Sequence, residues 1–358
     1  MKRTLTLVTA AALTLVSGVA PTLVNGAAAQ AATTPELPRP TGKAPVGMST
    51  LHLVDSSRPD PWNPAAESRE LLVSVWYPAR KAGGKPVRYL SPEESALILK
   101  QFPEVPPEIL ARTRTHATTD AVPRKGRLPL VLMSPGFSWP RATMTTLAED
   151  FASRGYLVAA VEHTYEAVAT FPDGRTTTCL ACVKGQDLAK VAASRVKDVR
   201  FVLDEVKKRW RVGDVAMVGM SAGGNTTAHA MRADRRIRAG VNLDGTFNPV
   251  PGRLARPFLL LGNPASHEPA GKDTTWGRAF ANMTGWKRWL TIDGSVHASF
   301  TDYGVLQPQI GLPDSEIGGA RGLLLTRTYV GAFLDRHLRG EKAPLLDRPE
   351  DSVVKRWK

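Results

Sequence analysis

The residues around Ser221 could support attack by a serine hydroxyl on an electrophilic carbon. Residues 219–223 read Gly-Met-Ser-Ala-Gly, between an apolar run at 215–218 and a proline-free segment at 222–231. The run predicts a buried strand and the segment a helix, and a G-x-S-x-G pattern in that context is typical of a nucleophilic serine at a sharp turn. Glycine on both sides lets the chain pass close to its neighbours. The alternative is a Gly-rich strand-to-helix turn whose serine only caps the helix.

The base that such a serine needs comes from one of three histidines. At a turn of this kind the usual order along the chain is serine, acid and then histidine, which leaves His267, His297 and His337. His337 lies late in an amphipathic helix, and His267 follows a strand where an acid is often found. His297 lies in a glycine-containing loop just after the last apolar strand. This position predicts that His297 is the base.

Several carboxylates could orient the imidazole of the base and stabilise its charged form. Asp244 ends the apolar run that follows the helix after the serine, where a carboxylate followed by glycine points toward the site. Its rivals are Glu268 and Asp273, which follow the next strand. Asp293 lies close to His297 in sequence and is assigned to a strand end or turn. Position alone favours Asp244 and leaves the rivals open.

Alternating apolar runs and amphipathic segments must position these residues. Two early runs predict antiparallel opening strands, and the later runs, apolar throughout, predict a mostly parallel sheet covered by helices on both faces. We therefore expect a single α/β domain of the α/β-hydrolase type at residues 49–345. The expected strands are 51–54, 71–77, 128–133, 157–161, 215–218, 239–243, 258–261 and 289–292, and the expected helices are 142–154, 187–210, 222–231 and 323–338.

Four short stretches and a few single residues carry a resemblance to a known family. They are Ser-Pro-Gly-Phe at 134–137, Val-Glu-His at 161–163, the glycine-rich stretch at 219–224, Asp244, and Gly-Ser-Val-His at 294–297 with Phe300 and Asp302. This set resembles the platelet-activating-factor acetylhydrolase family, the secreted, lipase-like branch of the α/β-hydrolases that includes related bacterial lipases. The resemblance covers most of the mature chain and implies that Asp244 is the acid. Met220, in place of the usual histidine or tryptophan before the serine, and the cysteine pair depart from the family.

Two backbone N–H groups could bind the negative charge that develops on a substrate oxygen. In an α/β-hydrolase one belongs to the residue after the nucleophile and the other to the loop after an earlier strand, which indicates Ala222 and Phe137. Phe137, Trp139 and Met220 are expected to contact the substrate, with the two aromatic rings as an apolar wall. The alternative for the rings is packing within their own loop.

The ends of the chain are expected to lie outside the domain. A basic pair at residues 2–3, an apolar run at 5–19 and a small-x-small site at 29–31 predict a signal peptide at 1–31, and hence an exported, extracellular protein. The other expected segments are a flexible leader at 32–48, an insertion or lid at 91–123 and a tail at 346–358.

The charge pattern and the two cysteines limit which partners and ligands we expect. The formal net charge is +14, but the basic residues are scattered and no nucleic-acid motif accompanies them. We expect no nucleic-acid partner, a weak attraction to anionic surfaces and a monomer. Cys179 and Cys182 are the only cysteines. Since zinc would need two more ligands, they predict a disulfide that pins a loop. The chemistry requires no metal or cofactor.

These residues together predict a secreted serine hydrolase that cleaves carboxylic esters through an acyl-enzyme. Ser221 would attack, His297 would accept and return the proton, and Asp244 would hold His297. The expected substrates are short- to medium-chain acyl lipid esters, and a polyester- or cutin-type hydrolase is the nearest alternative. The alternatives from other classes are a non-catalytic binding protein on a hydrolase scaffold, a peptidase and an acyltransferase.

Overall fold

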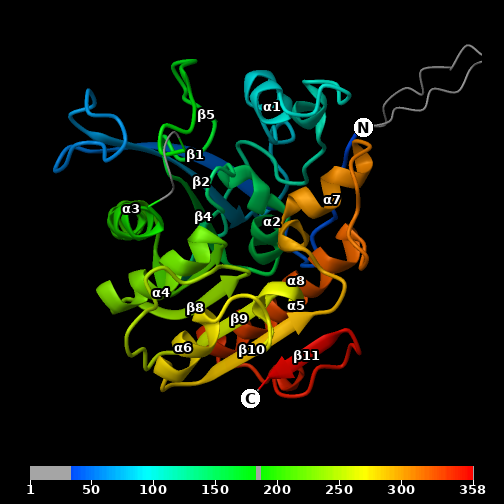
Figure 1. The fold of residues 1–358 in the computed structure, drawn as a ribbon. Helices are drawn as coiled ribbons and strands as arrows, with labels where there is room; N and C mark the ends of the chain where they lie inside the picture. The colour runs from blue at the N-terminus through cyan, green and yellow to red at the C-terminus, as the bar shows by residue number, and fades with distance from the viewer. Residues whose placement is uncertain (1–33, 183–186, 358) are drawn as a thin grey trace, which may run out of the picture. The chain divides into compact units, whose positions relative to one another are not determined.

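The computed structural model describes residues 34–182 and 187–357 (Figure 1). They belong to one folded unit, residues 33–358. The predicted signal peptide at 1–31 lies outside the described residues. None of the described helices is long and apolar enough to cross a membrane.

Eleven strands and eight α-helices occur along the described residues. The strands are β1 Val46–Asp55, β2 Arg69–Pro78, β3 Leu128–Ser134, β4 Leu157–Glu162, β5 Ala169–Thr170, β6 Thr176–Thr177, β7 Val212–Met220, β8 Ile237–Leu243, β9 Phe258–Gly262, β10 Lys287–Ile292 and β11 Val354–Trp357. The helices are α1 Pro92–Leu99, α2 Thr145–Ser153, α3 Leu188–Arg209, α4 Ala222–Ala233, α5 Pro264–His267, α6 Thr275–Asn282, α7 Asp302–Gln309 and α8 Gly319–Leu334.

Nine of the strands form one mixed sheet in the order β1-β2-β4-β3-β7-β8-β9-β10-β11. The six central strands, β4 to β10 in that order, pair in parallel. Antiparallel pairs attach β1 and β2 at one edge and β11 at the other. This arrangement confirms the predicted α/β-hydrolase fold with its mostly parallel sheet.

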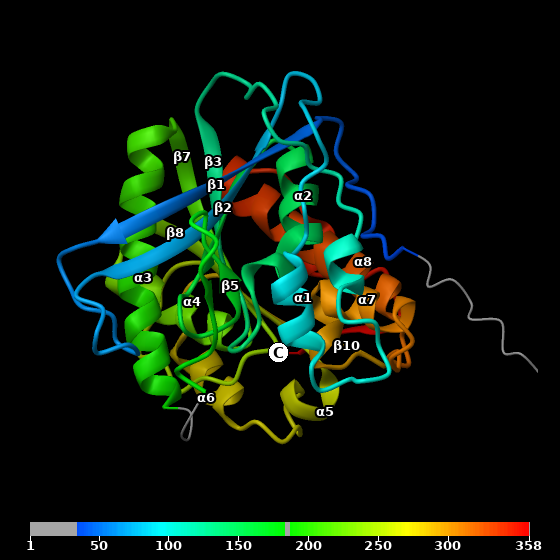
Figure 2. The same ribbon diagram turned by 90° about the horizontal axis from the view of Figure 1, so that it is seen from above.

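Helices cover both faces of the sheet (Figure 2). Helices α3, α4 and α6 pack in one core cluster, and α2 and α8 pack in the other. Strand β4 shows how the two cores divide its side chains. Leu157, Ala159 and Val161 belong to the α3 side, whereas Val158 and Ala160 belong to the α2 side. A strand buried on both faces reads as a continuous apolar run, which is why these strands could be predicted.

The domain extends further at both ends than the predicted range of 49–345. Leu37, in the predicted leader, is buried in a small cluster with the insertion and with Leu306 of α7. Residues 354–357, in the predicted tail, form β11. Residues 91–123, the predicted insertion or lid, contain α1 and a 3₁₀-helix, and α1 lies beside α7 (Figure 2).

Candidate active site

Ser221 lies at a strained turn between β7 and α4. Its backbone has φ 54° and ψ −119°, a conformation that residues with a side chain rarely adopt. A Cβ on Gly219 would lie 2.0 Å from the carbonyl oxygen of Gly223, and a Cβ on Gly223 would lie 2.0 Å from that of Ser134. The Ser221 N–H donates to the Leu243 carbonyl at 2.8 Å, which holds the turn against the end of β8. A side chain at Gly219 or Gly223 would therefore clash with the backbone, so both positions require glycine.

Asp244 and His297 form a hydrogen-bonded pair. Asp244 follows β8 and is buried, whereas His297 begins a short 3₁₀-helix after β10 and 46% of its side chain is exposed. His297 Nδ1 lies 2.6 Å from Asp244 Oδ2, which leaves the Nε2 of the ring for another partner. Burial raises the pKa of Asp244, but hydrogen bonds with His267 and His297 outweigh it and hold that pKa well below its usual range. Asp244 is therefore an ionised acceptor.

Two more residues bind the Asp244 carboxylate. Asn263 donates its backbone N–H at 2.7 Å and its side-chain amide at 2.8 and 2.9 Å. His267 places Nδ1 2.8 Å from Asp244 Oδ1 and Nε2 3.1 Å from Asp273 Oδ2, and its ring stacks on Trp276. By sequence, His267 and Asp273 are candidates for base and acid. In the structure both ring nitrogens of His267 are bonded to carboxylates, Nδ1 to Asp244 and Nε2 to Asp273, so neither nitrogen is left to accept a proton from Ser221.

One cavity brings together the predicted nucleophile, acid, base and backbone donors. Its volume is about 680 Å³. Ala222 is the first residue of α4, so its N–H has no acceptor within the helix. No hydrogen bond between Ser221 and His297 occurs in the described chain, and such bonds are often long without substrate. The favoured residues that line the cavity are Phe137, Ser221, Ala222, Asp244 and His297, and the rival candidates His267 and Asp273 line it too.

The remaining candidates for acid and base are not among the residues that line this cavity. Asp293 lies 3.5 Å from the Lys355 ammonium, and His337 packs against Trp286 with ring centroids 4.5 Å apart. Glu268 follows α5 and is not among the residues that line the cavity.

Trp139 lies between the cavity of Ser221 and a second, more apolar cavity. Its ring centroid lies 5.4 Å from that of His297 and 5.0 Å from that of Tyr303. The second cavity measures about 500 Å³ and is lined by Trp139 and by residues of α1 and α7. The predicted apolar wall at Trp139 therefore faces this neighbouring cavity.

The predicted contact between Met220 and substrate is wrong. Met220 is fully buried and belongs to the same core cluster as Ala216 and Val218. Side chains alternate along a strand, so every second residue of β7 enters this core, including the residue directly before Ser221.

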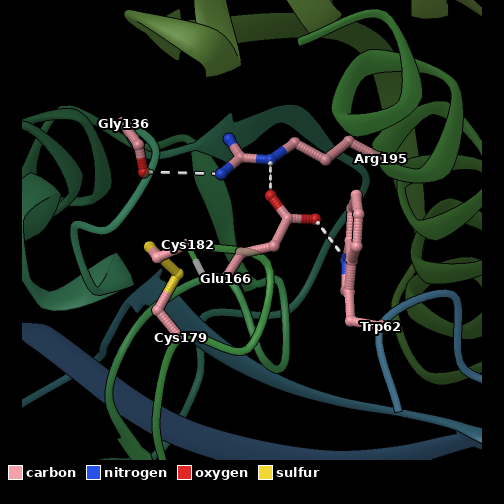
Figure 3. Close-up of a disulfide and its surroundings, with 6 residues drawn as sticks. All are labelled: Trp62, Gly136, Glu166, Cys179, Cys182 and Arg195. Carbon is pink, nitrogen blue, oxygen red and sulfur yellow. Dashed lines mark hydrogen bonds and ion pairs between the residues drawn. A yellow bond between two sulfur atoms is a disulfide. The ribbon is translucent and has the colours of Figure 1, made fainter. Parts of the chain in front are cut away.

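Cys179 and Cys182 form the predicted disulfide (Figure 3). Within the ring that it closes, the Ala181 N–H donates to the Tyr165 carbonyl at 3.0 Å. The disulfide therefore lies against the segment that follows β4.

His163, Glu166 and Asp198 lie close enough together to share a metal ion. However, arginines already occupy both carboxylates. Arg69 donates to Asp198 at 2.9 Å and Arg195 donates to Glu166 at 2.8 Å. All of these side chains are buried, so the group is a satisfied ion-pair network and not a metal site.

The same network contains a second serine, histidine and aspartate that are linked by hydrogen bonds. His163 Nε2 lies 2.9 Å from Ser134 Oγ, and His163 Nδ1 lies 2.8 Å from Asp198 Oδ2. Burial and the charge of Arg195 lower the pKa of His163 to about 3, so the ring is neutral. Ser134 is fully buried, and no substrate can reach its hydroxyl. This series can only support the loop after β3.

The fold and the turn at Ser221 define the class of the protein as an α/β-hydrolase. The solved structure of a ferulic acid esterase from Streptomyces cinnamoneus superposes with a TM-score of 0.80. Its sequence is 40% identical, and the match covers 91% of this chain and 100% of that one.

The particular family follows from a family model described as "Platelet-activating factor acetylhydrolase, isoform II", which matches residues 105–173 and 175–313. The chain belongs to this family and is a carboxylic ester hydrolase. A probable 1-alkyl-2-acetylglycerophosphocholine esterase of Arthroderma benhamiae is 26% identical over 87% of this chain and 91% of the relative. The platelet-activating factor acetylhydrolase of Bos taurus is 24% identical over 64% of this chain and 61% of the relative.

Proposed function

We propose that Ser221 is the nucleophile of this ester hydrolase, with His297 as its base and Asp244 as the carboxylate that orients His297. Ser221 Oγ attacks the ester carbonyl while His297 takes the hydroxyl proton. Collapse of the tetrahedral intermediate gives the acyl-enzyme, and His297 returns the proton to the departing alcohol. Water then repeats the sequence and releases the acid. The N–H groups of Phe137 and Ala222 bind the oxyanion in both steps.

One observation carries this proposal. A serine with strained backbone geometry lines the same cavity as a half-exposed histidine whose Nδ1 is bonded to a buried, ionised aspartate. Each feature suits one role, since the turn exposes the hydroxyl, the carboxylate fixes the tautomer and the free Nε2 can accept a proton.

A fluorophosphonate probe and the Ser221→Ala variant test the nucleophile. We expect the wild type to be labelled once, at Ser221, and the variant to remain unlabelled. Its kcat should fall on the order of 10⁶-fold, as when the serine of other hydrolases is removed. Equal labelling of both proteins, or no labelling of the wild type, would favour a non-catalytic binding protein.

The substrate is proposed to be an ester whose apolar group lies against Trp139 in the second cavity. That cavity is lined by apolar side chains such as Leu97, Leu306 and Ile310. Short- to medium-chain acyl lipid esters remain the first candidates. Hydroxycinnamate esters are the second, because the 40% identical structure is that of a ferulic acid esterase.

A substrate panel separates these candidates. It contains nitrophenyl esters of graded acyl length, an acetylated glycerophospholipid, methyl ferulate and a polyester film. A maximum in kcat/KM at one acyl length, which Trp139→Ala shifts to longer chains, would support acyl lipids. Preference for methyl ferulate would support the second candidate. Preference for the film with a flat chain-length profile would exclude both and indicate a polyesterase.

Export is also part of the proposal. The sequence at 1–31 has the pattern of a signal peptide, and a disulfide suits an oxidising compartment. The full chain expressed in a secreting host should appear in the medium with residue 32 as its first residue, as read by N-terminal sequencing. Retention of the intact N-terminus in the cell would contradict export.

A further inference from the structure

Arg195 holds the loop that carries one of the proposed oxyanion donors. It lies in α3, and only 1% of its surface is exposed. Its guanidinium donates to the Pro135 carbonyl at 2.6 Å, to Ser134 Oγ at 3.2 Å and to the Gly136 carbonyl at 3.4 Å. Its Nε donates to Glu166 at 2.8 Å. Figure 3 shows Arg195 between Glu166 and the loop.

The geometry of one peptide unit connects Arg195 to the chemistry. The Gly136 carbonyl and the Phe137 N–H belong to the same peptide bond, and in a trans peptide these two groups point in opposite directions. Arg195 lies on the carbonyl side of this unit. The Phe137 N–H therefore points away from Arg195, and Phe137 lines the cavity that also contains Ser221.

We propose that Arg195 is a positioning residue that fixes the Gly136–Phe137 peptide so that the Phe137 N–H faces the oxyanion. This role depends on the proposed function of Ser221 and deepens it. Arg195 touches no substrate, since it is buried behind the loop. Its effect on the reaction is the orientation of a donor before the negative charge forms, and a preorganised donor stabilises the transition state without further movement.

The chemistry of the guanidinium suits this task. Two successive loop carbonyls that turn away from solvent need donors, because a buried carbonyl without a partner is costly. A guanidinium offers five N–H donors in one rigid plane and can serve both carbonyls together with Glu166. A lysine in its place has one nitrogen and cannot reach all of these acceptors in a fixed geometry.

Glu166 completes the support from the other side. Its carboxylate balances the buried charge of Arg195 and also accepts the Trp62 indole N–H at 3.1 Å. Its backbone carbonyl accepts the Ser138 N–H at 3.0 Å. The loop is thus held on both sides of Phe137, by the Arg195 side chain at 135–136 and by the Glu166 backbone at 138.

The test compares Arg195→Met and Arg195→Lys with Arg200→Met, an exposed arginine on the same helix. Active sites are counted by complete reaction with a fluorophosphonate, and kcat and KM are measured per active site. A trifluoromethyl ketone that matches the acyl group of the substrate reports on the oxyanion, because its serine adduct carries the same charge.

We expect Arg195→Met to lower kcat by about 100-fold, as loss of one oxyanion donor does, with KM within about threefold of wild type. The Ki of the ketone should rise by the same factor as kcat falls. Arg195→Lys should show a smaller change in both, and Arg200→Met should match the wild type.

A purely structural role would lower the melting temperature and the number of active sites but leave kcat per site and the Ki of the ketone unchanged. That result would overturn the proposal. Should Arg195→Met fail to fold, Arg195→Lys and Glu166→Gln decide the question. For each of them the fall in kcat per active site is compared with the rise in the Ki of the ketone, both relative to the wild type. If the wild type itself is not labelled at Ser221, it is the proposed function that fails, which is a different outcome from unaffected Arg195 variants.

Discussion

At the scale of single residues, Asp244 joins two halves of the site. His297 bonds Oδ2, while His267 and the Asn263 backbone bond Oδ1. We expect Asp244→Asn to lower kcat about 10⁴-fold, because an amide nitrogen cannot accept from His297 and favours the wrong tautomer of its ring. The measurement is kcat per titrated active site. Asp273→Asn is the matched control, since it alters the same network one residue further out, and an equal loss there would contradict the role of Asp244.

His267 should stabilise the fold most in weakly acidic solution. Burial lowers its pKa, but hydrogen bonds with Asp244 and Asp273 outweigh burial and raise the pKa above its usual value. Burial raises the pKa of Asp273, but hydrogen bonds with His267 and Thr275 lower it to about 2, so Asp273 is charged throughout this range. A histidine whose pKa folding raises contributes stability that is complete below about pH 6.5 and is lost as the pH rises through the folded pKa.

The measurement is urea unfolding of the wild type and of His267→Gln at several pH values. We expect the difference in the free energy of unfolding to be largest below about pH 6.5 and to shrink as the pH rises from there into the alkaline range. A difference that stays constant or grows over this range would show that His267 is not protonated in the fold.

The cavity residues that could be predicted from the sequence share a simple property. Ser221, Asp244 and His297 each follow a predicted apolar strand, and the carboxyl ends of parallel strands meet at one edge of the sheet. Arg195 could not be found in this way, because a charged residue within an amphipathic helix reads as exposed. Its loop partners lie 60 and 61 positions away in the chain. Met220 was misassigned because nearness in sequence to Ser221 does not mean the same side of the strand.

At the scale of elements, the disulfide closes a ring from Cys179 to Cys182. Loop-closure entropy for so short a ring is worth about 2 kcal/mol. We expect the double variant Cys179→Ser, Cys182→Ser to lose no more than this in the free energy of unfolding and to keep kcat within about twofold. The ring bonds the segment after β4 through Ala181, whereas Glu166 in that segment has its own partners.

Urea unfolding and kcat per active site are the measurements, and the wild type with a reducing agent is the control. A loss of kcat without a loss of active sites would show instead that the ring helps to position the loop after β3.

The elements could be predicted best where they are long and regular. The central strands and helices α3, α4 and α8 follow from apolar runs and amphipathic periodicity. The sequence predicts an insertion at 91–123 but not its packing on α7, because that packing depends on contacts with distant residues such as Leu37 and Leu306. Strand β11 is short and has only one buried residue, Val354, so no periodic pattern marks it. Its place is set by the free edge of β10.

At the scale of the whole molecule, the two edges of the sheet need protection from pairing with other chains. An open edge presents unpaired N–H and C=O groups to other chains and invites aggregation. At the C-terminal edge β11 pairs with β10, and the Trp357 indole donates to Thr291 Oγ1 at 3.0 Å. Strand β10 leads within a few residues to His297, so this edge supports both the fold and the loop that carries His297.

Deletion of residues 353–358 should therefore destabilise and aggregate the protein. Loss of the buried Val354 side chain and of the Trp357 hydrogen bond amounts to about 3 kcal/mol, which corresponds to a fall in melting temperature of about 5 °C in a domain of this size. Light scattering on heating should rise earlier than in the wild type, because the edge of β10 is exposed. Lys355→Ala, which keeps the strand but removes an exposed side chain, is the control. An unchanged melting temperature in the deletion variant, or an equal fall in Lys355→Ala, would show that pairing of β11 with β10 is not what protects this edge.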